Sequence, residues 1–345
     1  MKKVFQISKV AILSFFTIAI ASCSSGDEVT PIVNTPTGPT KNIVQLAQAN
    51  PNLSRLVEAV TQAGLGATLS GAGTFTVFAP TNAAFDASNI TSAYIAAQVS
   101  VAQKEALKQI LLNHVLGATY TSTQLTTNYY KTLAIGTASA TNKLSMYVSN
   151  TPAAGVLING GSATGFNGGK VSTADAVATN GIVHIVDGVI KLPTVVDHAK
   201  ANNDFSTLVA ALTFNSASGF ATTLSGTGPF TVFAPTNAAF TAFLTEIGVT
   251  TGLPGIPPAT LEKVLKYHVV NGVNVLSTTL VNNQIVQTFA GTTPNEAFTI
   301  QIATTGGGTT VTIKDASNRI STITYTDVQA ANGVIHVINK VLKPV

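Results

Sequence analysis

The sequence is poor in the residues that most often carry chemistry. Its 345 residues include one cysteine, no tryptophan and two arginines, and charged side chains make up 9% of the chain, against about 25% in typical soluble proteins. A single cysteine excludes an internal disulfide and a cluster of thiolate ligands for a metal. Neutral polar residues and alanine take the place of the charges, as in many secreted and cell-surface proteins.

Little positive charge remains once the N-terminus is set aside. The formal net charge is +4, but three of the 18 basic residues lie in the first nine positions, which leaves 15 basic against 14 acidic side chains from residue 23 onward. The sequence has no basic cluster that would neutralise phosphates. It also lacks a glycine-rich phosphate loop, a zinc-protease motif and a serine-hydrolase motif. We therefore expect no nucleic-acid partner, no cofactor and no enzymatic activity.

The first 22 residues are predicted to be a signal peptide. Lys2 and Lys3 precede an apolar run, Val10 to Ala21, which is too short to span a membrane. The residues before Cys23 read Ile-Ala-Ser and resemble the lipobox of bacterial lipoproteins, in which the cysteine is lipidated and becomes the mature N-terminus. The alternative is a free cysteine beside an ordinary signal-peptidase site.

Residues 23–41 are predicted to be a flexible tether behind this anchor. They are rich in Ser, Thr, Pro and Gly, a composition that buries no core. Acyl chains on Cys23 would hold the protein on a lipid bilayer, because each buried CH₂ contributes about 0.8 kcal/mol. Asp27 and Glu28 resemble the export signal of some outer-membrane lipoproteins. We expect a lipid-anchored protein of the cell envelope, at the outer membrane, and leave open whether it is surface-exposed or periplasmic.

A long internal repeat sets the number of domains. Residues 68–85 read TLSGAGTFTVFAPTNAAF and residues 223–240 read TLSGTGPFTVFAPTNAAF, with 16 of 18 positions identical at a spacing of 155. This spacing is the length of a whole domain. We expect one domain at residues 42–193 and a second at 194–345. The repeated stretch predicts a turn, a buried strand and a corner capped by Thr or Asn, although a ligand-binding loop is the alternative.

Two amphipathic helices are predicted in each half, because apolar residues recur at i, i+3, i+4 and i+7. The first helix has its stripe at Leu53, Leu56, Val57 and Val60, repeated at Phe205, Leu208, Val209 and Leu212. The second has Leu107, Ile110, Leu111 and His114, repeated at Leu261, Val264, Leu265 and His268. Alternating apolar residues after these helices predict strands. Each half then closes on Asn-Gly, which predicts a tight turn, followed by an apolar run that contains His184 or His336.

These features, in the same order in both halves, resemble the fasciclin domain. The resemblance rests on TVFAPTNAAF, on a helix that ends in His-Val, and on the closing Asn-Gly run with its histidine. It covers residues 42–345. It implies an α+β fold with two tandem fasciclin-like domains, each a roughly seven-stranded β wedge or sandwich with packed helices. It also implies extracellular, often membrane-anchored proteins of adhesion that need no cofactor.

The resemblance suggests binding residues as well. Animal fasciclin proteins use a Tyr-His pair in the second helix as part of an integrin-contacting region. The second domain has Tyr267-His268 at this place, whereas the first has Asn113-His114. We expect binding surfaces where the halves differ, at these pairs or at residues 120–130 against 274–284.

Four histidines, at positions 114, 184, 268 and 336, recur in register, as do Asp175 and Asp327. A metal needs three or four close ligands, and catalysis needs a base paired with a nucleophile or carboxylate. Neither half offers a convincing set of metal ligands or catalytic partners. Both aspartates are expected in polar loops as Asx turns. We expect an adhesion protein that contacts surface, matrix or glycan components. A structural partner in an envelope complex and a histidine-based metal-binding or enzymatic protein are the alternatives.

Overall fold

The computed structural model describes residues 38–214, 218–305 and 308–345. The predicted signal peptide, Cys23 and residues 23–37 of the predicted tether lie outside these ranges. Within them, no helix is long and apolar enough to cross a membrane.

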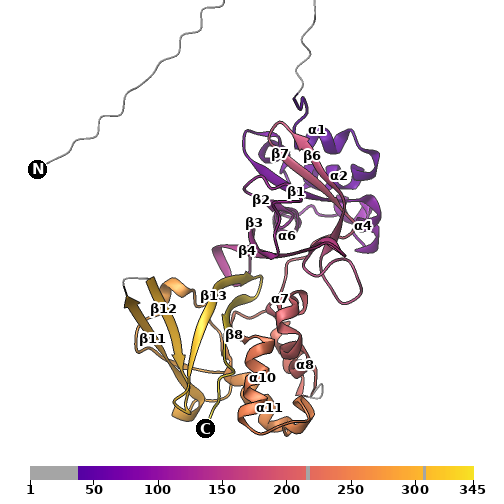
Figure 1. Cartoon of the computed structure of the whole chain (residues 1–345). Helices are drawn as coiled ribbons and strands as arrows, with labels where there is room; N and C mark the ends of the chain where they lie inside the picture. Colours follow the sequence, from indigo (N-terminus) through magenta and orange to yellow (C-terminus); the bar gives the residue numbers. More distant parts are fainter. Residues whose placement is uncertain (1–37, 215–217, 306–307) are drawn as a thin grey trace, which may run out of the picture. The chain divides into compact units, whose positions relative to one another are not determined.

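Nearly the same order of helices and strands occurs twice along the chain (Figure 1); the first copy has one more α-helix, α5 (Ser92–Ala96), between its first two strands. The first copy consists of α1 (Ile43–Gln48), α2 (Ser54–Gln62), α3 (Gly66–Ser70), β1 (Phe75–Pro80), α4 (Asn82–Ala87), α5 (Ser92–Ala96), α6 (Val101–Leu112), β2 (Val115–Leu116), β3 (Asn128–Gly136), β4 (Ser139–Thr151), β5 (Gly155–Ile158), β6 (Gly169–Ala178) and β7 (Gly181–Val186). The second consists of α7 (Val195–Ala201), α8 (Ser206–Phe214), α9 (Phe220–Leu224), β8 (Phe230–Pro235), α10 (Asn237–Glu246), α11 (Pro258–Tyr267), β9 (Val269–Asn271), β10 (Ile285–Gln287), β11 (Ala297–Thr305), β12 (Gly308–Lys314), β13 (Ile320–Ala330) and β14 (Gly333–Ile338).

Each copy builds its strands into one seven-stranded sheet. In the first copy β1 to β7 pair in sequence order and close into a barrel, because β7 returns to lie parallel to β1. In the second copy the order is β10-β11-β12-β13-β14-β8-β9, and β14 lies parallel to β8. The prediction of two α+β domains with about seven strands and packed helices is confirmed.

The repeated stretch forms a strand and a capped corner, as its residue types predict. In the first copy β1 is buried and Thr81 caps α4 by accepting a hydrogen bond from the Ala84 amide at 3.2 Å. The Asn82 side chain accepts from the Arg55 amide at 3.0 Å and donates to the carbonyl of Pro51 at 3.0 Å. Thr236 and Asn237 repeat these roles in the second copy. The stretch therefore ties the strand-to-helix corner to the start of α2 or α8, and its polar side chains serve the fold.

Two apolar clusters fill each domain. In the second domain, one cluster lies between the helices and the strands β8 and β14, and the other lies among β8, β11, β12 and β13. Figure 1 shows the corresponding division, with α8, α10 and α11 gathered on one side of β8 and with β11 and β12 on the other. The first domain divides in the same way. The predicted stripe of the first helix faces the helix-side cluster, since Leu53, Leu56 and Val60 are buried there.

Candidate binding surface and the repeated polar residues

His114 and His268 stand at equivalent places just after α6 and α11, and both are buried. The Nδ1 atom of His114 lies 2.8 Å from the Ile110 carbonyl, and its Nε2 accepts from the Ile190 amide at 2.9 Å. A carbonyl only accepts and an amide only donates, so this geometry requires the neutral tautomer with hydrogen on Nδ1. His268 has the same arrangement with Val264 and Leu342. Burial lowers the pKa of each imidazole to about 4.

Tyr267 and Asn113, the residues that precede these histidines, are also buried. The Tyr267 hydroxyl donates to the Ala297 carbonyl at 2.6 Å and accepts from the Ala316 amide at 3.0 Å. Burial raises the pKa of this hydroxyl to about 12. The Asn113 amide group donates to the Lys191 carbonyl at 3.0 Å. Both side chains therefore fasten the end of a helix to the neighbouring backbone.

None of these four side chains presents a surface to a partner in this conformation, since at most 3% of any of them is exposed. Their hydrogen bonds give each a structural role. The binding role predicted for Tyr267, His268, Asn113 and His114 stays a prediction, and burial does not favour it. The other place where the halves differ, residues 120–130, lines a cleft in the first domain.

His184 and His336 form a second repeated pair, each beside an aspartate. The Nε2 atom of His184 donates to the Tyr120 carbonyl at 3.0 Å, and its Nδ1 accepts from the Asp175 amide at 3.2 Å. The Asp175 carboxylate accepts from the amide and hydroxyl of Ser122 at 2.8 and 2.6 Å. His336 repeats this arrangement. Burial lowers the pKa of both histidines, so both are neutral near pH 7.

The two aspartates do not lie in loops, contrary to the expectation from the sequence. Asp175 is within β6 and Asp327 within β13, each at a shift of register against the next strand. Their φ angles of 62° and 59° are left-handed, which Asp tolerates better than most residues. Each is thus part of a β-bulge that turns a carboxylate toward a neighbouring loop.

These contacts leave little room for a metal. Both ring nitrogens of His114, His184, His268 and His336 are already hydrogen-bonded to backbone groups. Within the part of the chain that the structure describes, no three His, Cys, Asp or Glu side chains gather as metal ligands would. The four histidines and two aspartates recur because the fold uses them twice.

A cleft of about 580 Å³ lies in the first domain where residues 120–130 differ from their counterparts. We call it the tyrosine cleft; its lining includes Tyr120, Tyr129, Tyr130, Lys131 and Lys143. The rings of Tyr120 and Tyr130 meet edge to face with centroids 5.2 Å apart. No carboxylate lines the cleft. Residues 274–284 of the second domain contain no aromatic residue, so the second domain has no equivalent pair of tyrosine rings in this segment.

Different forces hold the aromatic side chains of the cleft in place. The Tyr130 hydroxyl accepts from the Thr126 amide at 2.9 Å, which fixes the loop before β3. The Tyr120 ring packs on the strand-side core of the first domain, and its hydroxyl makes no hydrogen bond among the described residues. The sequence indicated the tyrosines, but not the lysines, because only the pairing of β3 with β4 brings Lys143 beside them.

The sequence model of the fasciclin-domain family matches residues 51–193 and 203–344. The chain belongs to the fasciclin family. The predicted family is therefore confirmed, while the exact domain boundaries at 42–193 and 194–345 stay a prediction. Fasciclin domains are linked to cell adhesion, and proteins that share them are extracellular or at the cell surface.

Several proteins are similar to this fasciclin chain. Human periostin is 29% identical over 281 residues, which cover 80% of the chain and 29% of periostin. The ig-h3 protein of Sus scrofa, a transforming growth factor-beta-induced protein, is 29% identical over 88% of the chain and 38% of its own length. Protein sll1483 of Synechocystis is 39% identical over 44% of the chain and 73% of its own length. The chain thus spans less than two fifths of the two animal proteins.

A solved structure, the FAS1 domain pair of the insect cell adhesion molecule fasciclin I, aligns with 85% of the chain and 97% of its own length. Its TM-score is 0.49 and its sequence identity is 19%.

Proposed function

We propose that this protein is a non-enzymatic adhesion protein of the cell envelope, which binds a surface, matrix or glycan component through the tyrosine cleft of its first domain. The family supports adhesion as the class of function. The tyrosine cleft carries the proposal for where the binding happens, since it combines aromatic faces with lysine ammonium groups and has no carboxylate in its lining.

The chemistry of the cleft suits a sugar chain. Tyrosine supplies a rigid ring that buries apolar area and a hydroxyl that hydrogen-bonds, at a low cost in side-chain entropy. The apolar face of a sugar ring fits against such a side chain, and the sugar hydroxyls take up the hydrogen bonds. Lys131 and Lys143 add positive charge that favours acidic groups on the sugar. Each ammonium group also donates to oxygens of the protein: Lys131 to the Ser145 hydroxyl at 3.1 Å and the Asp327 carbonyl at 2.7 Å, and Lys143 to the Leu133 carbonyl at 2.8 Å.

A binding test with one pair of matched variants examines this proposal. The purified full chain is applied to an array of glycans and matrix proteins as wild type, Tyr120→Leu and Tyr94→Leu. Leucine at 120 keeps the packing on the core but removes the ring and the hydroxyl. Tyr94 is 45% exposed on α5 and does not line the cleft, so it serves as the control. We expect Tyr120→Leu to bind at least about fivefold more weakly, a loss of about 1 kcal/mol, and Tyr94→Leu to bind as the wild type does.

Two results would contradict the proposal. One is the absence of binding across the array, together with normal attachment of cells that lack the protein. The other is equal weakening by both substitutions, which would place the contact outside the cleft.

We also propose that Cys23 carries the lipid that anchors the protein, with residues 24–41 as the tether. The support is the resemblance of residues 20–23 to a lipobox and the apolar run before them. In this arrangement the adhesion domains stand away from the bilayer, at the outer membrane. Proteolysis of intact cells would separate a surface-exposed protein from a periplasmic one, and adhesion requires the exposed one.

A further inference from the structure

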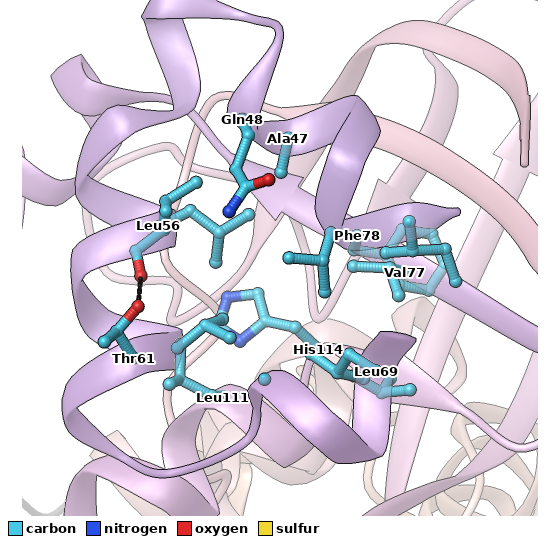
Figure 2. A pocket seen from close by; sticks show the side chains of 15 residues that line it. Ala47, Gln48, Leu56, Thr61, Leu69, Val77, Phe78, Leu111 and His114 are labelled. Atoms are coloured by element: carbon cyan, nitrogen blue, oxygen red, sulfur yellow. Dashed lines mark hydrogen bonds between the residues drawn. The ribbon is translucent and has the colours of Figure 1, made fainter. Parts of the chain in front are cut away.

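The first domain contains a second hollow, an apolar cavity of about 150 Å³ beneath its helices (Figure 2). Its walls come from α1, α2 and α3, with Ala47, Leu56 and Leu69 among them. Its floor is formed by Val77 and Phe78 of β1 and by Leu111 and His114 at the end of α6. We call it the helix cavity. It is separate from the tyrosine cleft, since the two share no lining residue.

Apart from Gln48 at the mouth, the polar side chains around the helix cavity are satisfied without a ligand or water. Both nitrogens of His114 are hydrogen-bonded to backbone groups. The Thr61 hydroxyl donates to the Val57 carbonyl at 2.8 Å, and Figure 2 shows this bond at the edge of the cavity. A water molecule inside would therefore find few partners, and apolar cavities of this kind stay dry. The cavity suits hydrocarbon.

The mouth of the cavity lies between α1 and α2. Gln48 and Thr61 are exposed there, and Val44, Val57 and Gly66 are half-buried. A Cβ atom placed on Gly66 would meet no other atom within 4 Å, so this side of the mouth is open. The Gln48 side-chain amide makes no hydrogen bond to any described residue, and in Figure 2 it lies over the cavity. It is thus a polar group available to a ligand that enters from this side.

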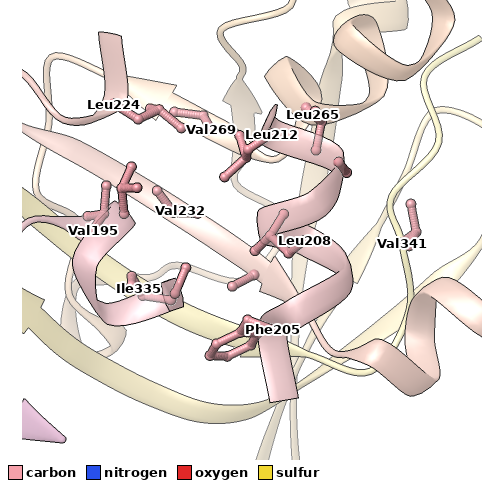
Figure 3. Packing of buried hydrophobic residues seen from close by; sticks show 14 of the residues in the cluster. Val195, Phe205, Leu208, Leu212, Leu224, Val232, Leu265, Val269, Ile335 and Val341 are labelled. Atoms are coloured by element: carbon pink, nitrogen blue, oxygen red, sulfur yellow. The ribbon is translucent and has the colours of Figure 1, made fainter. Parts of the chain in front are cut away.

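The second domain shows that the fold does not require this cavity. The equivalent hollow measures only about 20 Å³. Leu53, Val60 and Leu65 of the first domain are replaced by the larger Phe205, Leu212 and Phe220. These larger residues line the remaining space, whereas Leu53 and Leu65 do not reach the helix cavity. Figure 3 shows Phe205 and Leu212 within this filled core.

We propose that the helix cavity binds a compact hydrocarbon group of about the size of a benzene ring, on a ligand whose polar end stays at the mouth beside Gln48. The size follows from the volume, since an engineered cavity of about 150 Å³ lined by Leu, Ile and Phe accepts benzene. The apolar lining selects the chemistry of the buried part. Gln48 selects a hydrogen-bonding group for the other end. This site does not depend on the proposed adhesion through the tyrosine cleft.

Calorimetric titration of the full chain with benzene and with 1-hexanol tests the proposal. The matched variant is Val60→Leu/Leu65→Phe, which brings in residues that the second domain packs at the same places. We expect saturable binding of both compounds to the wild type, and at least tenfold weaker binding to this variant with no loss of thermal stability. Retained stability excludes unfolding as the cause of weak binding.

A second variant, Gln48→Ala, separates the two ends of the ligand. We expect it to weaken 1-hexanol binding severalfold and to leave benzene binding unchanged. No saturable binding of either compound to the wild type, or undiminished binding to Val60→Leu/Leu65→Phe, would overturn the site. Equal effects of Gln48→Ala on both compounds would overturn the assignment of the polar end.

Discussion

Replacing Asn180 by alanine would remove the side chain that joins the helices of the first domain to its sheet. Its carbonyl oxygen accepts from the Ile43 amide at 3.0 Å, at the start of α1. Its amide group donates to the carbonyls of Leu69 and Gly71 at 2.9 Å each, at the end of α3. The side chain is buried, and Asn332 makes the same three bonds in the second domain.

The expected cost follows from these three bonds. A typical hydrogen bond contributes about 1 kcal/mol net, and a buried partner left unpaired costs about 1–3 kcal/mol. Alanine removes all three bonds and leaves three backbone groups unpaired, which gives a loss of about 3 kcal/mol. For a domain of this size, about 2–4 °C of melting temperature is lost per kcal/mol. We therefore expect Asn180→Ala to lower the melting temperature of its domain by about 6–12 °C.

Differential scanning calorimetry of the full chain measures this loss. Asn332→Ala should produce a fall of similar size, because its bonds are the same. Asn52→Ala is the control, since Asn52 is exposed and its side chain makes no hydrogen bond among the described residues; its effect should stay within about 0.5 kcal/mol. A fall of less than about 2 °C for either buried asparagine would refute the reasoning.

Three further predictions concern protonation, a buried hydroxyl and the anchor. His114 and His268 have folded pKa values of about 4, below the 6.5 of the unfolded chain, so stability is full above pH 6.5 and is lost as the pH falls toward 4. Urea unfolding between pH 7 and 4.5 should show that the free energy of unfolding falls by up to about 1.4 kcal/mol per pH unit for each of these histidines. A free energy of unfolding that does not change over this range would contradict their burial in the neutral form. Tyr267→Phe leaves two backbone groups unpaired and should cost about 1–3 kcal/mol in chemical denaturation, with ligand binding unchanged; lost binding at unchanged stability would instead support the predicted contact role. Cys23→Ser should move the protein from the membrane fraction to the soluble fraction after ultracentrifugation, and membrane retention would rule out a lipid on this residue.

The fold could be predicted because its main signals are local or repeated. The i, i+3, i+4 and i+7 stripes give the helices, and the repeated TVFAPTNAAF gives the buried strand, the capped corner and the family. Thr81 and Asn82 have the roles that their residue types suggest.

The closing Asn-Gly predicts a tight turn, and the structure shows a further role for each of its two residues. The two-residue turn between β6 and β7 is Thr179-Asn180, and Gly181 is already the first residue of β7. Glycine is needed there because a Cβ atom would collide with the Phe75 carbonyl of the parallel strand. Asn180 is needed for its three bonds to residues more than 100 positions away. Neither reason is local, so the dipeptide alone could not reveal them.

The candidate sites depended on contacts that the sequence does not show. The stripe of α11 places Tyr267 at the helix end, but only the folded chain brings Ala297 and Ala316 over its hydroxyl. The aspartates at 175 and 327 gave no sign of a β-bulge, because a change of register arises from the pairing of two strands. The helix cavity depends on a few differences in side-chain size at positions that are apolar in both halves.

The features that recur and the features that differ separate fold from function in this chain. The capped corner, the buried asparagines and the hydrogen-bonded histidines occur in both domains, and each one satisfies backbone groups. The tyrosine cleft and the helix cavity occur in the first domain, and the second domain lacks the aromatic loop and fills the equivalent hollow. Each domain keeps the residues that its own fold requires, and the two differ at positions that the fold leaves free. Binding by this chain is therefore to be sought first in the first domain, at the residues that the repeat does not share.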